Sequence, residues 1–139
     1  MQTFSTQHII DWVTEKMPEF LTDLSEICSI RSVAETKNPS IPPFGPGCLD
    51  VLKKMFSLAE KYQMYTHDFD SYVVSISLEP DSKPAIGIWA HLDVVDEGSL
   101  SNWMYPPYEL TIKVGYAIAR GANDNKSSAI VGLYLLRYL

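Results

Sequence analysis

Ile86-Gly87-Ile88-Trp89-Ala90-His91-Leu92-Asp93-Val94-Val95 is the stretch from which the fold is predicted. Small and apolar residues fill positions 85 to 90, which is typical of a strand covered on both faces. We therefore expect residues 85–95 to form the central strand of an α/β domain. His91 and Asp93 stand two residues apart at its carboxyl end, so an extended chain places both side chains on one face.

A strand that ends in these two side chains indicates a metal site. Neutral imidazole and carboxylate oxygen are both zinc ligands, although a histidine taken alone is more often a satisfied core residue. Asp124, in the later segment Ala119-Arg120-Gly121-Ala122-Asn123-Asp124-Asn125-Lys126, can supply a second carboxylate. Because Asp124 stands just before a predicted helix, its alternative role is that of an N-cap, worth roughly 0.5–2 kcal/mol. The two roles can coexist.

The two segments resemble the signatures of the aminoacylase, carboxypeptidase and Xaa-His dipeptidase family of zinc exopeptidases. Those signatures, His-x-Asp-Val-Val and Arg-Gly-x-x-Asp-[Asp/Asn]-Lys, occur here in the same order, with Trp103 and Pro106-Pro107 between them. Phe44-Gly45-Pro46-Gly47 and Asp70-Ser71-Tyr72 also resemble the carnosinase-like branch. The chain departs from the family at Ser127, where a glycine usually follows the lysine.

The resemblance implies a fold and a role for each site residue. The implied fold is three-layer α/β/α with a mixed sheet, of the phosphorylase/hydrolase-like zinc exopeptidase type. His91 and Asp124 are then metal ligands, and Asp124 bridges two zinc ions, roughly 3.5–4 Å apart, with manganese or cobalt as alternatives. Asp93 is the catalytic-site carboxylate that accepts the other ring N–H of His91 and fixes its tautomer.

The implied reaction is hydrolysis of a dipeptide amide bond by metal-bound water. Two alternatives stay open: deacylation of an N-acyl amino acid, and a non-catalytic fragment that keeps the fold. Family members carry a later Glu-Glu pair, further ligands and a lid domain. Residues 1–139 are therefore expected to be the truncated amino-terminal part of the catalytic domain, inactive alone and weak in zinc binding.

The composition indicates a globular protein and argues against some kinds of binding partner. A chain of 139 residues with 46% hydrophobic content predicts one globular domain. Seventeen acidic and 11 basic residues give a net charge of −6, which argues against nucleic acid and anionic membranes as partners. No secretory signal or membrane-length apolar stretch is seen, so the cytoplasm is the predicted location. Cys28 and Cys48 are expected to be reduced and buried.

Periodicity and turn residues predict the other elements. A helix over residues 5–17 is expected to break or kink at Pro18, and a second helix continues to about Cys28. The remaining predictions are a loop over 32–47, a helix over 47–63, strands over 64–69 and 72–78, a turn over 80–84, and a hairpin over 109–119. The helix from about Asn125 is apolar on nearly every side and needs burial all round. Apolar faces left exposed predict self-association.

Overall fold

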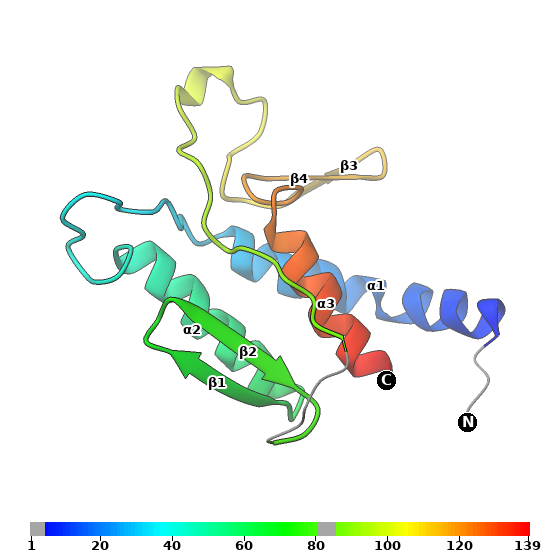
Figure 1. Ribbon diagram of the computed structural model, residues 1–139. Coiled ribbons are helices and arrows are strands. Elements are labelled where there is room, and N and C mark those ends of the chain that lie inside the picture. Colours follow the sequence, from blue (N-terminus) through cyan, green and yellow to red (C-terminus); the bar gives the residue numbers. More distant parts are fainter. Residues whose placement is uncertain (1–4, 81–85) are drawn as a thin grey trace.

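The computed structural model describes residues 5–80 and 86–139 (Figure 1). Its elements are α1 (Thr6–Cys28), α2 (Pro46–Lys61), β1 (Tyr65–Phe69), β2 (Val73–Ser77), the 3-10 helix η1 (Leu100–Asn102), β3 (Thr111–Lys113), β4 (Tyr116–Ile118) and α3 (Lys126–Tyr138). This mixture of helices and strands confirms the predicted α/β class. The turn predicted over 80–84 lies almost wholly outside the described residues.

A break or a kink is predicted at Pro18, and the break does not occur, because α1 is one continuous helix. A proline inside a helix costs about 3 kcal/mol through a lost hydrogen bond and a steric clash. Packing on both sides of the proline opposes that cost. Trp12 and Phe20 both meet the ring of Tyr134 edge-on, with centroid separations of 6.3 and 5.2 Å. The whole length of α1 is thereby held against α3.

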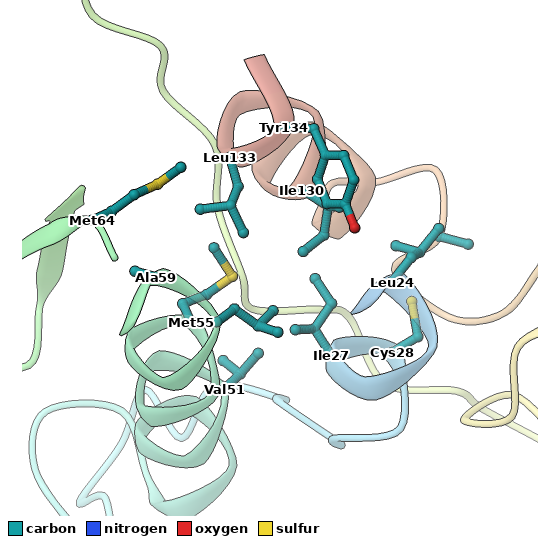
Figure 2. Close-up of a cluster of buried hydrophobic side chains, with 12 residues drawn as sticks. Leu24, Ile27, Cys28, Val51, Met55, Ala59, Met64, Ile130, Leu133 and Tyr134 are labelled. Atoms are coloured by element: carbon teal, nitrogen blue, oxygen red, sulfur yellow. The ribbon is translucent and has the colours of Figure 1, made fainter. Parts of the chain in front are cut away.

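The hydrophobic core lies where the three helices meet (Figure 2). The helices contribute apolar side chains that point toward one another, among them Leu24, Ile27, Val51, Met55, Ala59, Ile130 and Leu133. Cys28 and Cys48 are buried and free, as predicted. Burial raises the pKa of the Cys28 thiol to about 11, so this cysteine is a packing residue.

The predicted hairpin over 109–119 forms, and the two strands predicted over 64–69 and 72–78 pair with each other as a second antiparallel hairpin. β1 and β2 pair over five residues, from Tyr65 opposite Ser77 to Phe69 opposite Val73. β3 and β4 are joined by Val114 and Gly115, whose φ angles are +50° and +79°. Two positive φ angles in succession match the right-handed twist of a tight hairpin.

Residues 86–95 do not form the predicted central, buried strand. They run extended beside α3 (Figure 1), and their one pairing is a parallel bridge between Val33 and Val94. The side chains of Ile86 and Trp89 are 83% and 84% exposed. A strand apolar on both faces needs hydrogen-bonded neighbours and a covering layer. The described residues supply two separate two-stranded sheets instead of one mixed sheet.

The expected burial of α3 on all sides is also incomplete. Ile130, Leu133 and Tyr134 are buried, whereas Val131 and Leu135 are exposed. These two side chains line an apolar groove between α3 and the first half of α1. Self-association through this surface stays a prediction. No helix within the described ranges is long and apolar enough to cross a membrane.

A buried carboxylate joins all three helices. Asp23 of α1 accepts hydrogen bonds from Lys61 of α2, from Tyr62 just after α2 and from Tyr134 of α3, at 2.9, 2.5 and 2.8 Å. Burial and hydrogen bonding raise the pKa of both tyrosines. Tyr62 can also donate to Glu19 at 3.0 Å, whereas the Tyr134 hydroxyl, once the shared acceptor is removed, keeps only the longer 3.3 Å contact with the Tyr62 hydroxyl among the described residues.

Replacing this acceptor should therefore destabilise the helical core. Asp23→Ala is expected to lower the free energy of unfolding by about 1–3 kcal/mol, because it removes a buried charged acceptor that three donors share. The control Asp50→Ala removes an exposed aspartate of α2. It is expected to change the free energy of unfolding by less than about 0.5 kcal/mol. Urea unfolding followed by far-UV circular dichroism measures both values. Equal midpoints for the two variants contradict a structural role for Asp23.

Candidate metal centre

The three side chains predicted to form a site do meet. His91 Nε2 lies 3.0 Å from Asp124 Oδ1, although the two residues are 33 positions apart. His91 Nδ1 lies 3.2 Å from Asp93 Oδ1 and 3.1 Å from the Asp93 carbonyl oxygen. The His91 side chain is 49% exposed and that of Asp124 is 83% exposed. The cluster is therefore open to solvent.

Ser32 holds the extended segment that carries His91 and Asp93. Its hydroxyl donates to the carbonyl of Leu92 at 2.6 Å, and its own carbonyl accepts from the amide of Val94 at 3.0 Å. Ser32 is fully buried. These two bonds fix the backbone on either side of Asp93 without a sheet.

Lys126 fixes the segment that carries Asp124. This first residue of α3 is fully buried, and its amine donates to the carbonyls of Ile27 and Ile30 at 2.8 and 2.7 Å. Carbonyls at the carboxyl end of a helix attract a cation. Burial lowers the pKa of Lys126 to about 8, while Cys28 and Cys48 act in the opposite direction. The sequence analysis gave Lys126 no role, although it is the last residue of the second signature and stands at the start of an apolar helix.

Gly121 lets the turn before Asp124 close onto that anchor. Its φ angle is +86°, and a Cβ atom there would lie 2.9 Å from Lys126 Cδ and 3.0 Å from Val94 Cγ1. The turn therefore packs on both motif segments at once. The N-cap of α3 is Asn125, not Asp124, and its side chain makes no capping hydrogen bond. The capping alternative for Asp124 is thus not adopted, and its carboxylate faces His91.

A second polar cluster lies just beyond the site. Arg31 Nε donates to both carboxylate oxygens of Glu97 at 3.0 Å, and Tyr108 OH donates to one of them at 2.7 Å. These hydrogen bonds lower the pKa of Glu97 to about 2. Sequence analysis gave no role to Arg31, Glu97 or Tyr108, because nothing in the spacing of the three residues links them.

The carboxylates around His91 set its charge. Partial burial acts to lower its pKa, but contacts with Asp124 and Asp93 outweigh that effect and raise the pKa above its usual value. In its protonated form the His91 ring can donate to both neighbours. The ring is therefore held with Nε2 directed at Asp124 and Nδ1 at Asp93.

The donor set fits two ligands of one ion. Zn–N and Zn–O bonds of roughly 2.0–2.2 Å place two tetrahedral ligands about 3.4 Å apart, close to the 3.0 Å between His91 Nε2 and Asp124 Oδ1. Among the described residues, no group of three or more His, Cys, Asp or Glu side chains could hold a metal ion. The two donor atoms His91 Nε2 and Asp124 Oδ1 are fewer than the three protein ligands that a catalytic zinc generally has.

Residues 87–139 match the model of peptidase family M20/M25/M40. A "Putative dipeptidase" of Staphylococcus saprophyticus is 33% identical over 130 residues, which cover 93% of this chain and 27% of the relative. A protein of Bacillus subtilis with the same description is 31% identical over 127 residues, 90% of this chain and 27% of the relative. The chain thus spans about a quarter of the length of these relatives.

The fold also matches a solved enzyme. The crystal structure of human carnosine dipeptidase 1 superposes with a TM-score of 0.70 at 19% sequence identity. The match covers 94% of this chain and 30% of that one. This similarity confirms the predicted fold class.

The close approach at Gly121 can be tested separately from its backbone angle. Gly121→Ala is expected to lower the free energy of unfolding by about 1–3 kcal/mol more than Gly115→Ala, since overpacking costs that much. Both glycines have positive φ angles, but a Cβ at Gly115 meets nothing within 4 Å, so the control carries the same backbone strain. Chemical denaturation of the two variants gives the difference, and equal losses contradict the packing argument.

The Glu97 cluster predicts a dependence of stability on acid. The pKa of Glu97 is lowered in the folded chain from 4.5 to about 2, so the unfolded chain binds more protons between these values. The stabilisation is present above about pH 4.5 and is lost as the pH falls toward about 2. The difference in unfolding free energy between the wild type and Glu97→Gln should shrink between about pH 6 and about pH 2.5. A difference that stays constant over this range argues against the ion pair.

Proposed function

We propose that the chain is part of a peptidase of family M20/M25/M40, whose model matches residues 87–139, and that it contributes metal ligands to a metal-dependent dipeptidase. The observation that carries the proposal is the 3.0 Å approach of His91 Nε2 to Asp124 Oδ1. Two motifs 33 residues apart converge there on one point with donors that suit zinc. Manganese or cobalt would suit the same donors.

Each residue of the cluster has its own task in this proposal. Asp93 accepts the Nδ1–H of His91, which leaves Nε2 free of its proton and directed at the metal. Asp124 would supply a carboxylate oxygen to the same ion and, as the family resemblance implies, would be shared with a second one. A metal bound there would supply Lewis-acid polarisation of the substrate carbonyl and would lower the pKa of a coordinated water to about 7. Because His91 binds metal only when neutral, metal binding releases a proton.

The substrate proposed is a dipeptide. The relatives and the solved enzyme that match this chain are described as dipeptidases. These descriptions favour a peptide over the N-acyl amino acids that the sequence also allowed. If the enzyme that contains this chain cleaved N-acetyl or N-succinyl amino acids and no dipeptides, the proposed substrate would be wrong. The proposed role of His91 and Asp124 in metal binding would be unaffected. Location in the cytoplasm stays a prediction.

We propose further that residues 1–139 are the amino-terminal part of the catalytic domain. His91 and Asp124 are two ligands, whereas a catalytic zinc generally has three. The remaining ligands and a general base must then come from residues outside this chain. A general base alone is worth about 10²–10⁴-fold in rate, so the isolated chain should not hydrolyse dipeptides.

Metal titration of the chain tests the ligand assignment. By isothermal calorimetry with Zn²⁺, the wild type should bind weakly, and His91→Ala and Asp124→Asn should each weaken binding at least tenfold, the size of effect that the loss of a supporting partner has. His67→Ala removes an exposed histidine of β1 and should leave the affinity unchanged. If neither site variant differs from this control, the assignment is wrong.

A further inference from the structure

Glu97 lies at the start of a loop that connects the two motif segments. Its side chain is 18% exposed, although that of its partner Arg31 is about half exposed. Arg31 comes from the segment after α1 and contacts the carboxylate of Glu97 from one side. Tyr108, at the far end of the loop, donates to the same carboxylate. One side chain thus joins the beginning and the end of the loop to the body of the chain.

The loop in turn holds Arg120, the first residue of the second motif. The Arg120 amide donates to the carbonyl of Pro107 at 2.6 Å, and its guanidinium donates to the carbonyl of Asp96 at 3.3 Å. The same guanidinium lies over the ring of Trp103, 5.1 Å from its centroid. Trp103 donates its indole N–H to the carbonyl of Glu97 at 2.9 Å. Arg120 is therefore held at three points by a loop that is itself fixed at Glu97.

From this chain of contacts we propose that Glu97 is a positioning residue for the candidate metal centre. It keeps residues 91–96 and 120–124 at the separation at which His91 and Asp124 serve one ion. The Arg31 Nε–H is shared between both oxygens of Glu97, while Nη2 of the same guanidinium donates to Asp96 at 2.6 Å, so one charged group holds two neighbouring carboxylates of the loop. The metal part of this inference rests on the proposed function, whereas the coupling of the two segments does not.

Glu97→Gln is the variant that isolates the carboxylate charge. Glutamine keeps the size of the side chain and an oxygen that can accept from Tyr108, but it loses the ion pair with Arg31. Glu60→Gln makes the same change of charge at an exposed position of α2 and serves as the control. Arg31→Met removes the other partner and is the second variant should Glu97→Gln fail to fold.

Two measurements on the purified chain test the proposal. In ¹H–¹⁵N spectra without metal, Glu97→Gln should shift the amide resonances of residues 120–124, more than 20 positions away in the sequence, and Glu60→Gln should not. Co²⁺ titration followed by its visible absorption should show affinity reduced about tenfold, the lower end of the effect of a lost supporting contact. Glu97→Gln should reduce the Co²⁺ affinity less in an Arg31→Met background than in the wild type, because Glu97 and Arg31 act as one pair.

The outcomes separate this inference from the proposed function. Unshifted resonances at 120–124 overturn the coupling, whatever the metal does. Shifted resonances with unchanged Co²⁺ affinity overturn the positioning role. If the wild type shows no Co²⁺ binding at His91 and Asp124 while the resonances shift, the proposed function fails and the coupling of the two segments stands.

Discussion

The amine of Lys126, buried at the carboxyl end of α1, is the contact on which the arrangement of this chain depends. It joins the first turn of α3 to the carbonyls of Ile27 and Ile30. The amino-terminal end of α3 is thereby fixed against the carboxyl-terminal end of α1. Gly121 packs on the lysine stem and on Val94. Lys126 therefore places the turn before α3 and, through the contact of Gly121 with Val94, helps to place the first motif segment that Ser32 also holds. Burying a charged amine has a free-energy cost, and that cost lowers the pKa of Lys126 to about 8. The carbonyls at the end of the helix offset part of the cost.

The candidate centre is built on irregular backbone, and side-chain contacts replace the sheet that usually supports such a site. Ser32 holds the segment of His91, Lys126 holds the segment of Asp124, and Glu97 joins the two through its loop. Sites on loops are less precise than sites on strands. The several side-chain hydrogen bonds around the candidate centre compensate for the missing sheet. The residues that position the site differ in burial from a proposed ligand. The positioning side chains are partly or wholly buried, whereas the Asp124 carboxylate is exposed.

Local patterns predicted the elements that depend on near neighbours. The α2 helix, both hairpins and the buried cysteines follow from spacing and from turn residues such as Gly115. The meeting of His91, Asp93 and Asp124 was expected from motif order and is seen in their distances. Pro18 and residues 85–95 were misjudged, because the first depends on packing between α1 and α3 and the second on strands that the described residues do not supply. Lys126 and Glu97 act through contacts 66 to 99 residues apart, which no local pattern contains.

The central claim is that His91 and Asp124 bind one metal ion together. Crystals of the chain grown with Zn²⁺, measured at the zinc absorption edge, locate the ion directly by its anomalous signal. The account predicts an ion within about 2.0–2.2 Å of both His91 Nε2 and Asp124 Oδ1, with Asp93 still on the other ring nitrogen. An ordered His91 and Asp124 with zinc bound elsewhere, or with only one of them in contact with the ion, would contradict it.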